Sequence, residues 1–438
     1  MPPKKVLYVI HGHPAVRPGG AEGYALELYE AMRDSSEEVE PVLLARNGPP
    51  HSTATGHEGT LTALVGDDPN QLLFETDATN YDWFFGTSPN KVPLTKYFRD
   101  LLLAHRPDVV HFHHSLFMGY DMIRATRRTL PEAAIVYTLH EYLPICHRHG
   151  QMVRTNGDEL CLEASPRRCH GCFPDIAPRE FLLRERYVKS HFQDVDLFIA
   201  PSRFLMDRYL DWGIEPERIL NEDYGRHPVT RAPDVERTGP RTRLGFFGQF
   251  SHYKGVNVLL HAMTMLHETD PDIRAWLHGA NLDIQPEDFQ EEFGTLLEAA
   301  GESVVMAGRY ESHELAQLMQ QTDWVVVPSR WWENSPLVIQ EAFAHGRPVI
   351  CSDIGGMAEK IVDRVNGLHF RAGDPASLAE TIRTAVRDEE LWERLRAEIS
   401  PPHRMDEHIH RLEAIYNDLL DRPDRGPASG DVPQGLAS

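Results

Sequence analysis

Residues 324–351 read WVVVPSRWWENSPLVIQEAFAHGRPVIC, and this stretch indicates the fold of the whole chain. It opens with an apolar run at 324–328, continues with a helical pattern at 336–345 and closes with a second apolar run at 347–351. Continuous apolar runs on either side of a helix are typical of parallel strands whose two faces are both covered. The stretch therefore predicts one β–α–β unit of a parallel sheet.

The same alternation extends from this unit in both directions along the chain. Further apolar runs occupy 5–10, 41–45, 108–113, 133–139 and 195–200 in the first half, and 243–248, 273–279, 303–307 and 367–370 in the second. Longer amphipathic runs separate them. Two such series predict an α/β protein with two doubly wound Rossmann-like domains facing a central cleft.

A polar stretch divides the two series. Residues 226–242, RHPVTRAPDVERTGPRT, contain three prolines and no periodicity, so we interpret them as an interdomain linker. The final residues are rich in proline, glycine, aspartate and serine, which predicts disorder. The expected segments are an N-terminal domain at 1–225 with a cysteine-rich insertion at 144–175, a second domain at 243–400, a helix at 401–421 and a disordered tail at 422–438.

Composition excludes several classes of function. The 438 residues include 44 basic and 66 acidic side chains, a formal net charge of −22, which argues against general binding to nucleic acid. No tract of about 18 apolar residues could span a bilayer. The N-terminal MPPKKVLYVI has too short an apolar core for a signal peptide. We therefore expect a cytoplasmic protein.

Two loops at predicted strand ends could hold a phosphate. Gly19 and Gly20 precede a helix, where glycine lets the backbone approach an anion and the helix N-terminus offers free N–H groups. Residues 244–255, LGFFGQFSHYKG, place Lys254 in a similar loop, where it could meet a diphosphate as a point charge. A plain connecting loop and a solvated lysine are the alternatives.

The stretch 328–346 carries two carboxylates. Glu333 lies just before a predicted helix and Glu341 within it, beside residues that look buried. We expect Asn334 or Ser335 to cap this helix and Pro336 to occupy its first turn. A carboxylate accepts hydrogen bonds from paired hydroxyls, so both suit a sugar or ribose ring. The alternatives are that Glu333 is a simple acidic residue of the first helical turn and that Glu341 is a surface residue.

These motifs together resemble the family-four retaining glycosyltransferases, whose fold is GT-B. Residues 328–346 are similar to that family's E-x7-E segment, Gly19–Gly20 to its glycine loop and 245–255 to its G-x-x-x-x-x-K-G element. Gly308–Arg309 resembles the turn after its nucleotide-side strand. Residues 403–420 resemble the helix that crosses back onto the N-terminal domain in GT-B proteins.

The resemblance implies a site. Glu341 would hold a ribose, Lys254 the diphosphate and Glu333 the transferred sugar. His140 resembles the active-site histidine, so the implied catalytic residues are His140, Glu333 and Lys254, without a catalytic divalent metal. The implied donor-binding residues are Gly19, Gly20, Gln249, Lys254, Arg309, Glu333, Asn334, Ser335, Pro336, Leu337, Val338 and Glu341. Many members carry arginine where this chain has Gln249, and Arg309 or Arg330 could substitute for that charge.

The implied activity is transfer of a hexose-type sugar, with retention, from a nucleotide-diphosphate sugar to a glycan or lipid-linked acceptor, in surface polysaccharide or glycolipid biosynthesis. Alternatives are a nucleotide-sugar epimerase of the same fold and a non-catalytic sugar-nucleotide or glycan-binding subunit. Trp83, Phe84 and Phe85, in the irregular stretch 51–100, either form an acceptor lid or pack on the domain. Residues 179–192 are basic and aromatic, and are a candidate for peripheral contact with the inner face of a membrane, although solvated basic helices are common.

Four cysteines cluster at Cys146, Cys161, Cys169 and Cys172, with spacing C-x14-C-x7-C-x2-C. Four thiolates form a closed tetrahedral zinc site, and the segment between them has little to bury, so we expect structural Zn²⁺ there. An iron–sulfur cluster and free or disulfide-bonded cysteines are the alternatives, and a nearby histidine could replace one ligand. Cys351 ends an apolar run, which predicts a buried core thiol.

Overall fold

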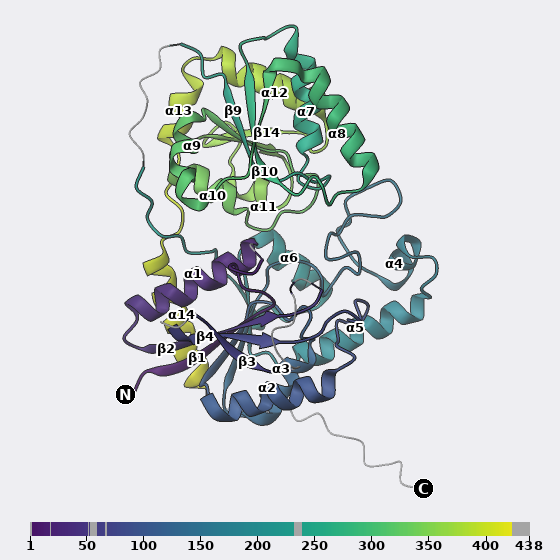
Figure 1. Ribbon diagram of the computed structural model, residues 1–438, viewed down its shortest axis with the longest axis vertical. Helices are drawn as coiled ribbons and strands as arrows, with labels where there is room; N and C mark the ends of the chain where they lie inside the picture. Colours follow the sequence, from purple (N-terminus) through teal and green to yellow (C-terminus); the bar gives the residue numbers. More distant parts are fainter. Residues whose placement is uncertain are drawn as a thin grey trace.

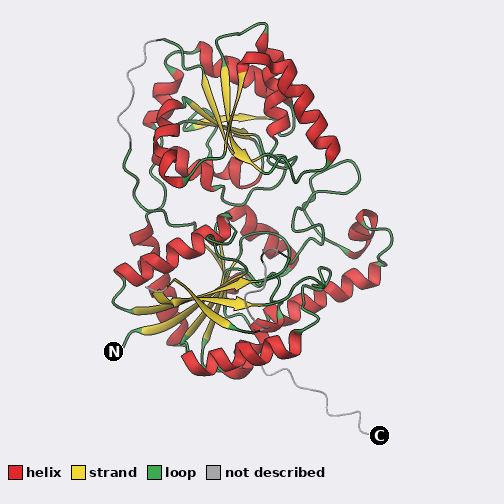
Figure 2. Ribbon diagram, in the orientation of Figure 1, coloured by secondary structure: helices red, strands yellow, loops and turns green. Residues whose placement is uncertain are grey.

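The computed structural model describes residues 2–17, 19–50, 52, 59–65, 68–231 and 239–422. Two α/β domains lie one above the other, each built around its own sheet (Figure 1). Helices cover both faces of each sheet (Figure 2). The predicted pair of doubly wound domains is therefore confirmed.

The first domain contains an eight-stranded sheet in the order β3-β4-β2-β1-β5-β6-β7-β8. Its strand pairs are parallel except for β3, which runs antiparallel to β4 at the edge. The strands are β1 (Lys4–Ile10), β2 (Val39–Asn47), β3 (Leu61–Val65), β4 (Asp68–Glu75), β5 (Val109–Phe112), β6 (Ala134–Thr138), β7 (Leu197–Ala200) and β8 (Ile219–Asn221). The helices are α1 (Gly20–Ser35), α2 (Lys91–His105), α3 (Asp121–Thr129), α4 (Pro166–Cys172), α5 (Pro178–Phe192) and α6 (Arg203–Trp212).

The second domain contains a six-stranded parallel sheet in the order β11-β10-β9-β12-β13-β14. The strands are β9 (Arg243–Gln249), β10 (Arg274–Ala280), β11 (Val304–Gly308), β12 (Trp324–Val327), β13 (Val349–Ser352) and β14 (Gly367–Phe370). The helices are α7 (Val256–His267), α8 (Glu287–Ala300), α9 (Leu315–Gln321), α10 (Leu337–Ala344), α11 (Gly355–Lys360), α12 (Pro375–Arg387) and α13 (Leu391–Ala397).

Strand β1 shows why the apolar runs are continuous. Successive side chains of a strand point to opposite faces of the sheet. Leu7 and Val9 accordingly join one hydrophobic core, whereas Val6, Tyr8 and Ile10 join a second core on the other face. Because helices cover both faces, every position from Val6 to Ile10 is apolar and at most 1% exposed.

The chain returns to the first domain at its C-terminal end. Helix α14 (Met405–Leu420) packs on α1, and the hydroxyl of Tyr416 lies 2.8 Å from Nδ1 of His111. The entry to α14 runs beside the segment that leaves the first domain, because the N–H of Arg226 donates to the carbonyl oxygen of His403 and the N–H of Met405 donates to the carbonyl oxygen of Arg226. Two chain crossings therefore lie together between the domains.

The stretch 51–100 is more regular than its sequence indicates. It contains β3, β4 and most of α2, and the partly polar sequence DPNQLLFE of β4 hid a strand that lies next to the edge of the sheet and is only partly buried. The centre of the expected linker, 232–238, and most of the expected tail, 423–438, lie outside the described residues. Within the described ranges, no helix combines the length and apolar character needed to cross a membrane.

Candidate functional site

A buried ion pair marks the carboxyl end of the second sheet. Nζ of Lys254, in the loop after β9, lies 2.7 Å from Oε1 of Glu333, which is 7% exposed. The same oxygen accepts hydrogen bonds from Oγ of Ser329 at 2.7 Å and from Nε1 of Trp331 at 2.9 Å. Burial alone would raise the pKa of Glu333, but Lys254 and these donors outweigh it, so the pKa lies below its usual value.

Glycines allow these loops to meet. Gly255, next to Lys254, has φ +68°, and a Cβ there would lie 1.8 Å from the carbonyl oxygen of Pro328. A Cβ on Gly356 would lie 1.6 Å from the carbonyl oxygen of Asn334. Any larger residue at either place would push apart the loops that bring Lys254 and Glu333 together.

The start of helix α10 differs from its expected capping. Asn334 and Ser335 do not cap it: the helix begins at Leu337, after Pro336, without a side-chain cap hydrogen bond. Oγ of Ser335 instead donates to Asp223 at 2.7 Å, and Oδ1 of Asn334 accepts from Ser202 at 3.0 Å. Both side chains are drawn toward the first domain, which leaves the N–H groups of the first turn to attract an anion.

The N-terminal glycine loop lies opposite this helix. A Cβ at Gly20, the first residue of α1, would lie 3.7 Å from Cδ1 of Leu337. The loop that precedes α1 and the start of α10 therefore face each other across the domain boundary. The structure brings these two predicted elements together.

Glu341 lies one turn further along α10. Its Oε1 is 3.4 Å from Nη2 of Arg226, whose Nη1 is 3.0 Å from Glu27 on α1. Burial raises the pKa of Glu341 above its usual value, Arg226 opposes the rise and Glu27 adds to it. Arg226 thus joins the two domains beside the carboxylate that the sequence assigned to a ribose.

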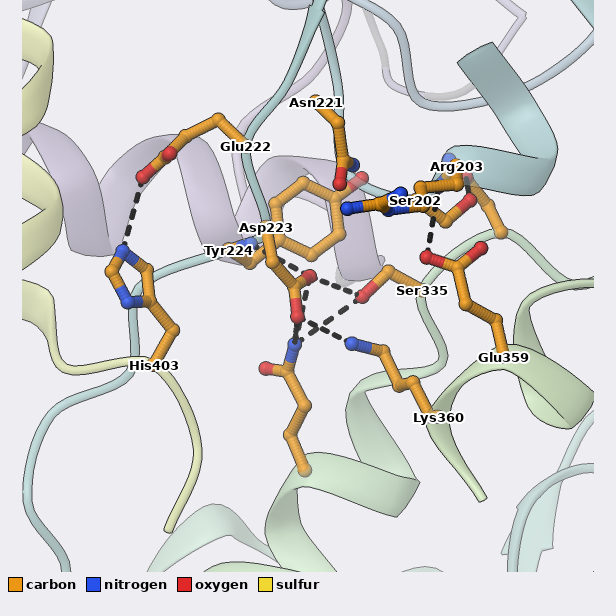
Figure 3. A network of polar contacts seen from close by, with 12 residues as sticks. Ser202, Arg203, Asn221, Glu222, Asp223, Tyr224, Ser335, Glu359, Lys360 and His403 are labelled. Carbon is orange, nitrogen blue, oxygen red and sulfur yellow. Dashed lines mark hydrogen bonds and ion pairs between the residues drawn. The ribbon is translucent and has the colours of Figure 1, made fainter. Parts of the chain in front are cut away.

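A network of polar contacts also crosses the boundary (Figure 3). The carboxylate of Asp223, just after β8, accepts hydrogen bonds from Ser335, from Gln340 at 3.1 Å and from Nζ of Lys360. Glu359 accepts hydrogen bonds from the backbone N–H groups of Arg203 and Phe204 at 2.9 Å, which places a second-domain carboxylate at the positive end of α6.

Glu222, His403 and His408 lie beside this network and connect the two chain crossings. They form the set of histidine, cysteine and acidic residues in the described ranges whose ligand atoms all lie within 4.8 Å of one another. Oε1 of Glu222 is 3.0 Å from Nε2 of His403 and 2.9 Å from Nδ1 of His408. These contacts satisfy the cluster as an ion-pair network without a metal ion.

Buried histidines form the first-domain wall. Nδ1 of His140 lies 2.6 Å from the hydroxyl of Tyr224, and its Nε2 lies 3.2 Å from Nδ1 of His113. Burial, reinforced by His113 and His11, holds the pKa of His140 well below its usual value. His113 and His114 also have lowered pKa values because they are buried. The imidazoles of this wall are therefore neutral at physiological pH.

A cavity of about 330 Å³ lies beside the loop between β1 and α1. It is lined on the first-domain side by the β1 loop with Gly19, by Arg46 and by Trp83, and on the second-domain side by Gln249. Of the three aromatic residues predicted to form a lid or to pack, Trp83 lines the cavity. Phe84 and Phe85 pack against α5 instead.

Other residues predicted to bind the donor or to supply its positive charge have partners outside the Lys254–Glu333 pair. Nη2 of Arg309 lies 3.5 Å from Oδ1 of Asn281 on an exposed surface. Arg330 directs its guanidinium toward His252, at 2.9 Å. Gln249 is exposed at the cavity. In this structure Lys254 is the cation that contacts Glu333.

The four clustered cysteines share one location. Cys146, Cys161, Cys169 and Cys172 line a single small cavity, and all are free thiols. Within the described ranges no three of their sulfur atoms lie within 4.8 Å of one another. Cys351 is buried in the second domain, as predicted.

Sequence reasoning missed the residues that join the two domains. Asp223 lies just before the predicted linker and Arg226 is its first residue. Lys360 lies at the end of a helix distant in sequence, so no local pattern connects the three. Trp331 and Trp332 did carry a signal, because two adjacent tryptophans in a loop need partners for their N–H groups. Their partners are Glu333 and the carbonyl of Cys161.

Comparisons with known families cover both domains. Residues 18–220 match the family described as Glycosyltransferase Family 4, and residues 233–400 match Glycosyl transferases group 1. A glycogen synthase of Mycobacterium tuberculosis is 25% identical over 398 residues, which cover 88% of this chain and 86% of the relative. A D-inositol 3-phosphate glycosyltransferase of Catenulispora acidiphila is 28% identical over 338 residues, covering 72% and 73%.

Solved structures show the same two-domain architecture. The Anabaena protein HepE in complex with UDP matches with a TM-score of 0.66 and 17% identity, over 94% of this chain and all of that one. A sucrose-phosphate synthase from Thermosynechococcus elongatus matches with a TM-score of 0.68 and 16% identity, over 95% and 99%. At these identities the likeness shows the GT-B fold.

Proposed function

Because the chain belongs to the family-four glycosyltransferases and has their GT-B fold, we propose that it transfers a hexose-type sugar from a nucleotide-diphosphate donor to a glycan or lipid-linked acceptor, with retention of configuration. The pairing of Lys254 with Glu333 beside the start of α10 carries this proposal. Similar structures bound to UDP, UDP and glucose, and UDP-glucose support a nucleotide-sugar donor.

The charges suit the departure of a diphosphate. Breaking the bond between sugar and phosphate places negative charge on the leaving group. Lys254 and the N–H groups at the start of α10 are already fixed where they can stabilise it, so little reorganisation is needed. The glycine loop at Gly20 lies across the boundary and lets the backbone approach the same anion.

Glu333 has two tasks in this arrangement. Its Oε1 is occupied by Lys254, Ser329 and Trp331, which fix the carboxylate in place. Its Oε2 accepts none of these hydrogen bonds and can accept them from hydroxyls of the transferred sugar. Glu341 would hold the ribose hydroxyls after Arg226 moves aside or shares the carboxylate.

The neutral imidazole of His140 suits the other side of the reaction. Positive charge develops on the anomeric carbon as the bond to phosphate breaks, and a charged imidazolium nearby would oppose it. The lowered pKa of His140 removes that repulsion, and the contacts of its two ring nitrogens with Tyr224 and His113 fix the ring in place.

The acceptor would enter the cavity that Trp83 and Gln249 line. An aromatic side chain can stack on a sugar ring, and an amide can form hydrogen bonds with its hydroxyls. For a lipid-linked acceptor, α5 would approach the membrane. It exposes Leu182 and Leu183 beside basic residues, and co-sedimentation with anionic vesicles would measure that contact.

The proposal is tested by following donor consumption with UDP-, GDP- and ADP-sugars, with and without a panel of glycan and lipid-linked acceptors. Transfer predicts consumption that rises with acceptor, and NMR of the product reports retention. A donor converted to its epimer without acceptor would identify an epimerase. Donor binding without turnover on any acceptor would identify a binding subunit.

A further inference from the structure

The cysteine-rich loop, residues 146–173, brings together four thiols from separate positions along the chain. Cys146 follows a short turn after β6, Cys161 follows an isolated antiparallel bridge between Val153 and Leu160, and Cys169 and Cys172 lie on α4. All four line the same cavity of about 30 Å³. That volume is close to the space of one or two water molecules, and sulfur surrounds it from several sides.

The loop is unevenly buried: Met152 and Val153 are 1% and 3% exposed, and Cys146 and Cys161 pack against the core of the first domain, whereas the part that carries Cys169 and Cys172 is poorly buried. Helix α4 has no buried residue, although it is one of the elements that position the sulfur atoms. Each of the four cysteines is only half-buried. A helix without buried residues gains little stability from the hydrophobic effect, whereas a metal bound by the four thiolates would hold α4 against the rest of the loop.

The surroundings also fit the charge of such a centre. Four thiolates around a doubly positive core carry a net charge of about −2. Arg148, Arg154 and Arg168 line the cavity. Free core cysteines, such as Cys351 in its apolar surroundings, have no comparable neighbours.

From the four thiols that line one cavity, the arginines beside them and the absence of buried residues on α4, we propose that the cysteine-rich loop holds a metal centre ligated by Cys146, Cys161, Cys169 and Cys172. Two centres take four thiolates, a zinc ion and an iron–sulfur cluster. In a tetrahedral zinc site the sulfur atoms are about 3.8 Å apart, given zinc–sulfur bonds of about 2.3 Å. The present sulfur atoms are more widely spread, so zinc would draw the loop inward, whereas a cluster would span the wider spacing.

The centre would also act across the domain boundary. Nε1 of Trp332 donates to the carbonyl oxygen of Cys161 at 2.9 Å, and Asp158 lies 3.1 Å from His252. Trp332 precedes Glu333, and His252 lies two residues before Lys254. A metal that fixes the loop therefore fixes the outer side of both segments that carry the ion pair.

Metal analysis of the full-length protein, purified without oxygen and without affinity metals, tests the centre. We expect about one zinc per chain without sulfide, or about four iron and four acid-labile sulfide with visible charge-transfer absorption. Either result supports the proposal and identifies the metal. Less than about a tenth of an equivalent of both metals, with four thiols open to alkylation in the native protein, would overturn it.

Variants then locate the centre. Cys172→Ser and Cys169→Ser should each lower metal content about tenfold or more, whereas Cys351→Ala, which removes the one other thiol, should retain it. If a ligand variant does not fold, the test rests on the wild-type protein, through its metal content and the protection of its four thiols from alkylation. Full metal content in both serine variants would place the metal elsewhere and contradict the proposal.

The link to the ion pair rests on the proposed function and is measured separately. Partial metal removal by a chelator should raise the donor dissociation constant about threefold to tenfold, and restored metal should reverse it. An unchanged donor affinity would show that the metal centre does not influence the ion pair across the domain boundary. It would not affect the conclusion drawn from the metal content. A protein that holds metal but never binds a nucleotide sugar would instead contradict the proposed function.

Discussion

The two walls of the cleft use opposite chemistry. The second-domain wall is charged: Lys254 and Glu333 form an ion pair, and the pKa of Glu333 lies below its usual value despite burial. The first-domain wall is neutral: His113 and His140 are buried with pKa values well below their usual range. The charged wall matches a group that leaves with negative charge, and the neutral wall avoids repelling the positive charge that develops on the sugar.

The difference also explains how each wall is supported. Glycines at 255 and 356 let backbone segments of the second domain pack closely around the ion pair. On the first-domain wall, Tyr24 and Tyr224 stack near His140 and hold the imidazole by ring contacts and one hydrogen bond. Each wall can therefore be disturbed separately.

Loss of the Glu333 charge should have the largest effect. Glu333→Gln keeps the shape of the side chain but leaves Lys254 without its partner and weakens the hydrogen bonds to the sugar. We expect kcat/KM for transfer to fall about 100- to 1,000-fold, measured by initial rates at varied donor concentration. Glu298→Gln, on the exposed side of α8, is the control. A loss below threefold would mean that Glu333 does not contact the reacting sugar.

Lys254→Ala should act mainly on donor binding, raising the donor KM about 10- to 100-fold. It should also shift the pH profile. In the wild type, Lys254 and neighbouring donors keep the pKa of Glu333 below its usual value, so Glu333 stays ionised to lower pH than an ordinary glutamate. Without Lys254, burial raises this pKa, and the acidic limb of kcat/KM should move to higher pH. If the acidic limb of kcat/KM stays at the same pH, the group that titrates there is not Glu333.

On the neutral wall, Tyr224→Phe removes the hydroxyl that holds His140. We expect kcat to fall about tenfold with little change in donor KM, because the histidine is misplaced but the phosphate-binding groups are intact. Tyr97→Phe, on the exposed face of α2, is the matched control. Equal losses in kcat and donor affinity would contradict a role confined to the sugar.

The smallest effect should follow from Asp223→Asn. Asp223 places a negative charge beside Ser335 and Gln340 at the start of α10, where a diphosphate would also bind. Removing that charge should tighten donor binding about twofold to fivefold by calorimetry. Asp272→Asn, an exposed aspartate distant from the boundary, should leave affinity unchanged. Weaker binding would show that Asp223 acts chiefly by holding the domains together.

Sequence patterns located most strands because buried parallel strands leave continuous apolar runs. They missed β3 and β4 at one side of the first sheet and the short strand β8 at its other edge. Glu333 and Lys254 were proposed from two separate motifs, and the structure brings their side chains together. The capping of α10 was wrong because Asn334 and Ser335 bind residues of the first domain, and no local signal reports that.

The sequence by itself determined that the chain forms two α/β domains, because strand and helix periodicity are properties of neighbouring residues. It also determined which loops carry glycine, lysine and carboxylate groups. Only the tertiary structure decided that Lys254 meets Glu333, that Arg226 meets Glu341 and that four cysteines line one cavity. Those pairings depend on burial and on distances between segments far apart in sequence, which no local pattern encodes.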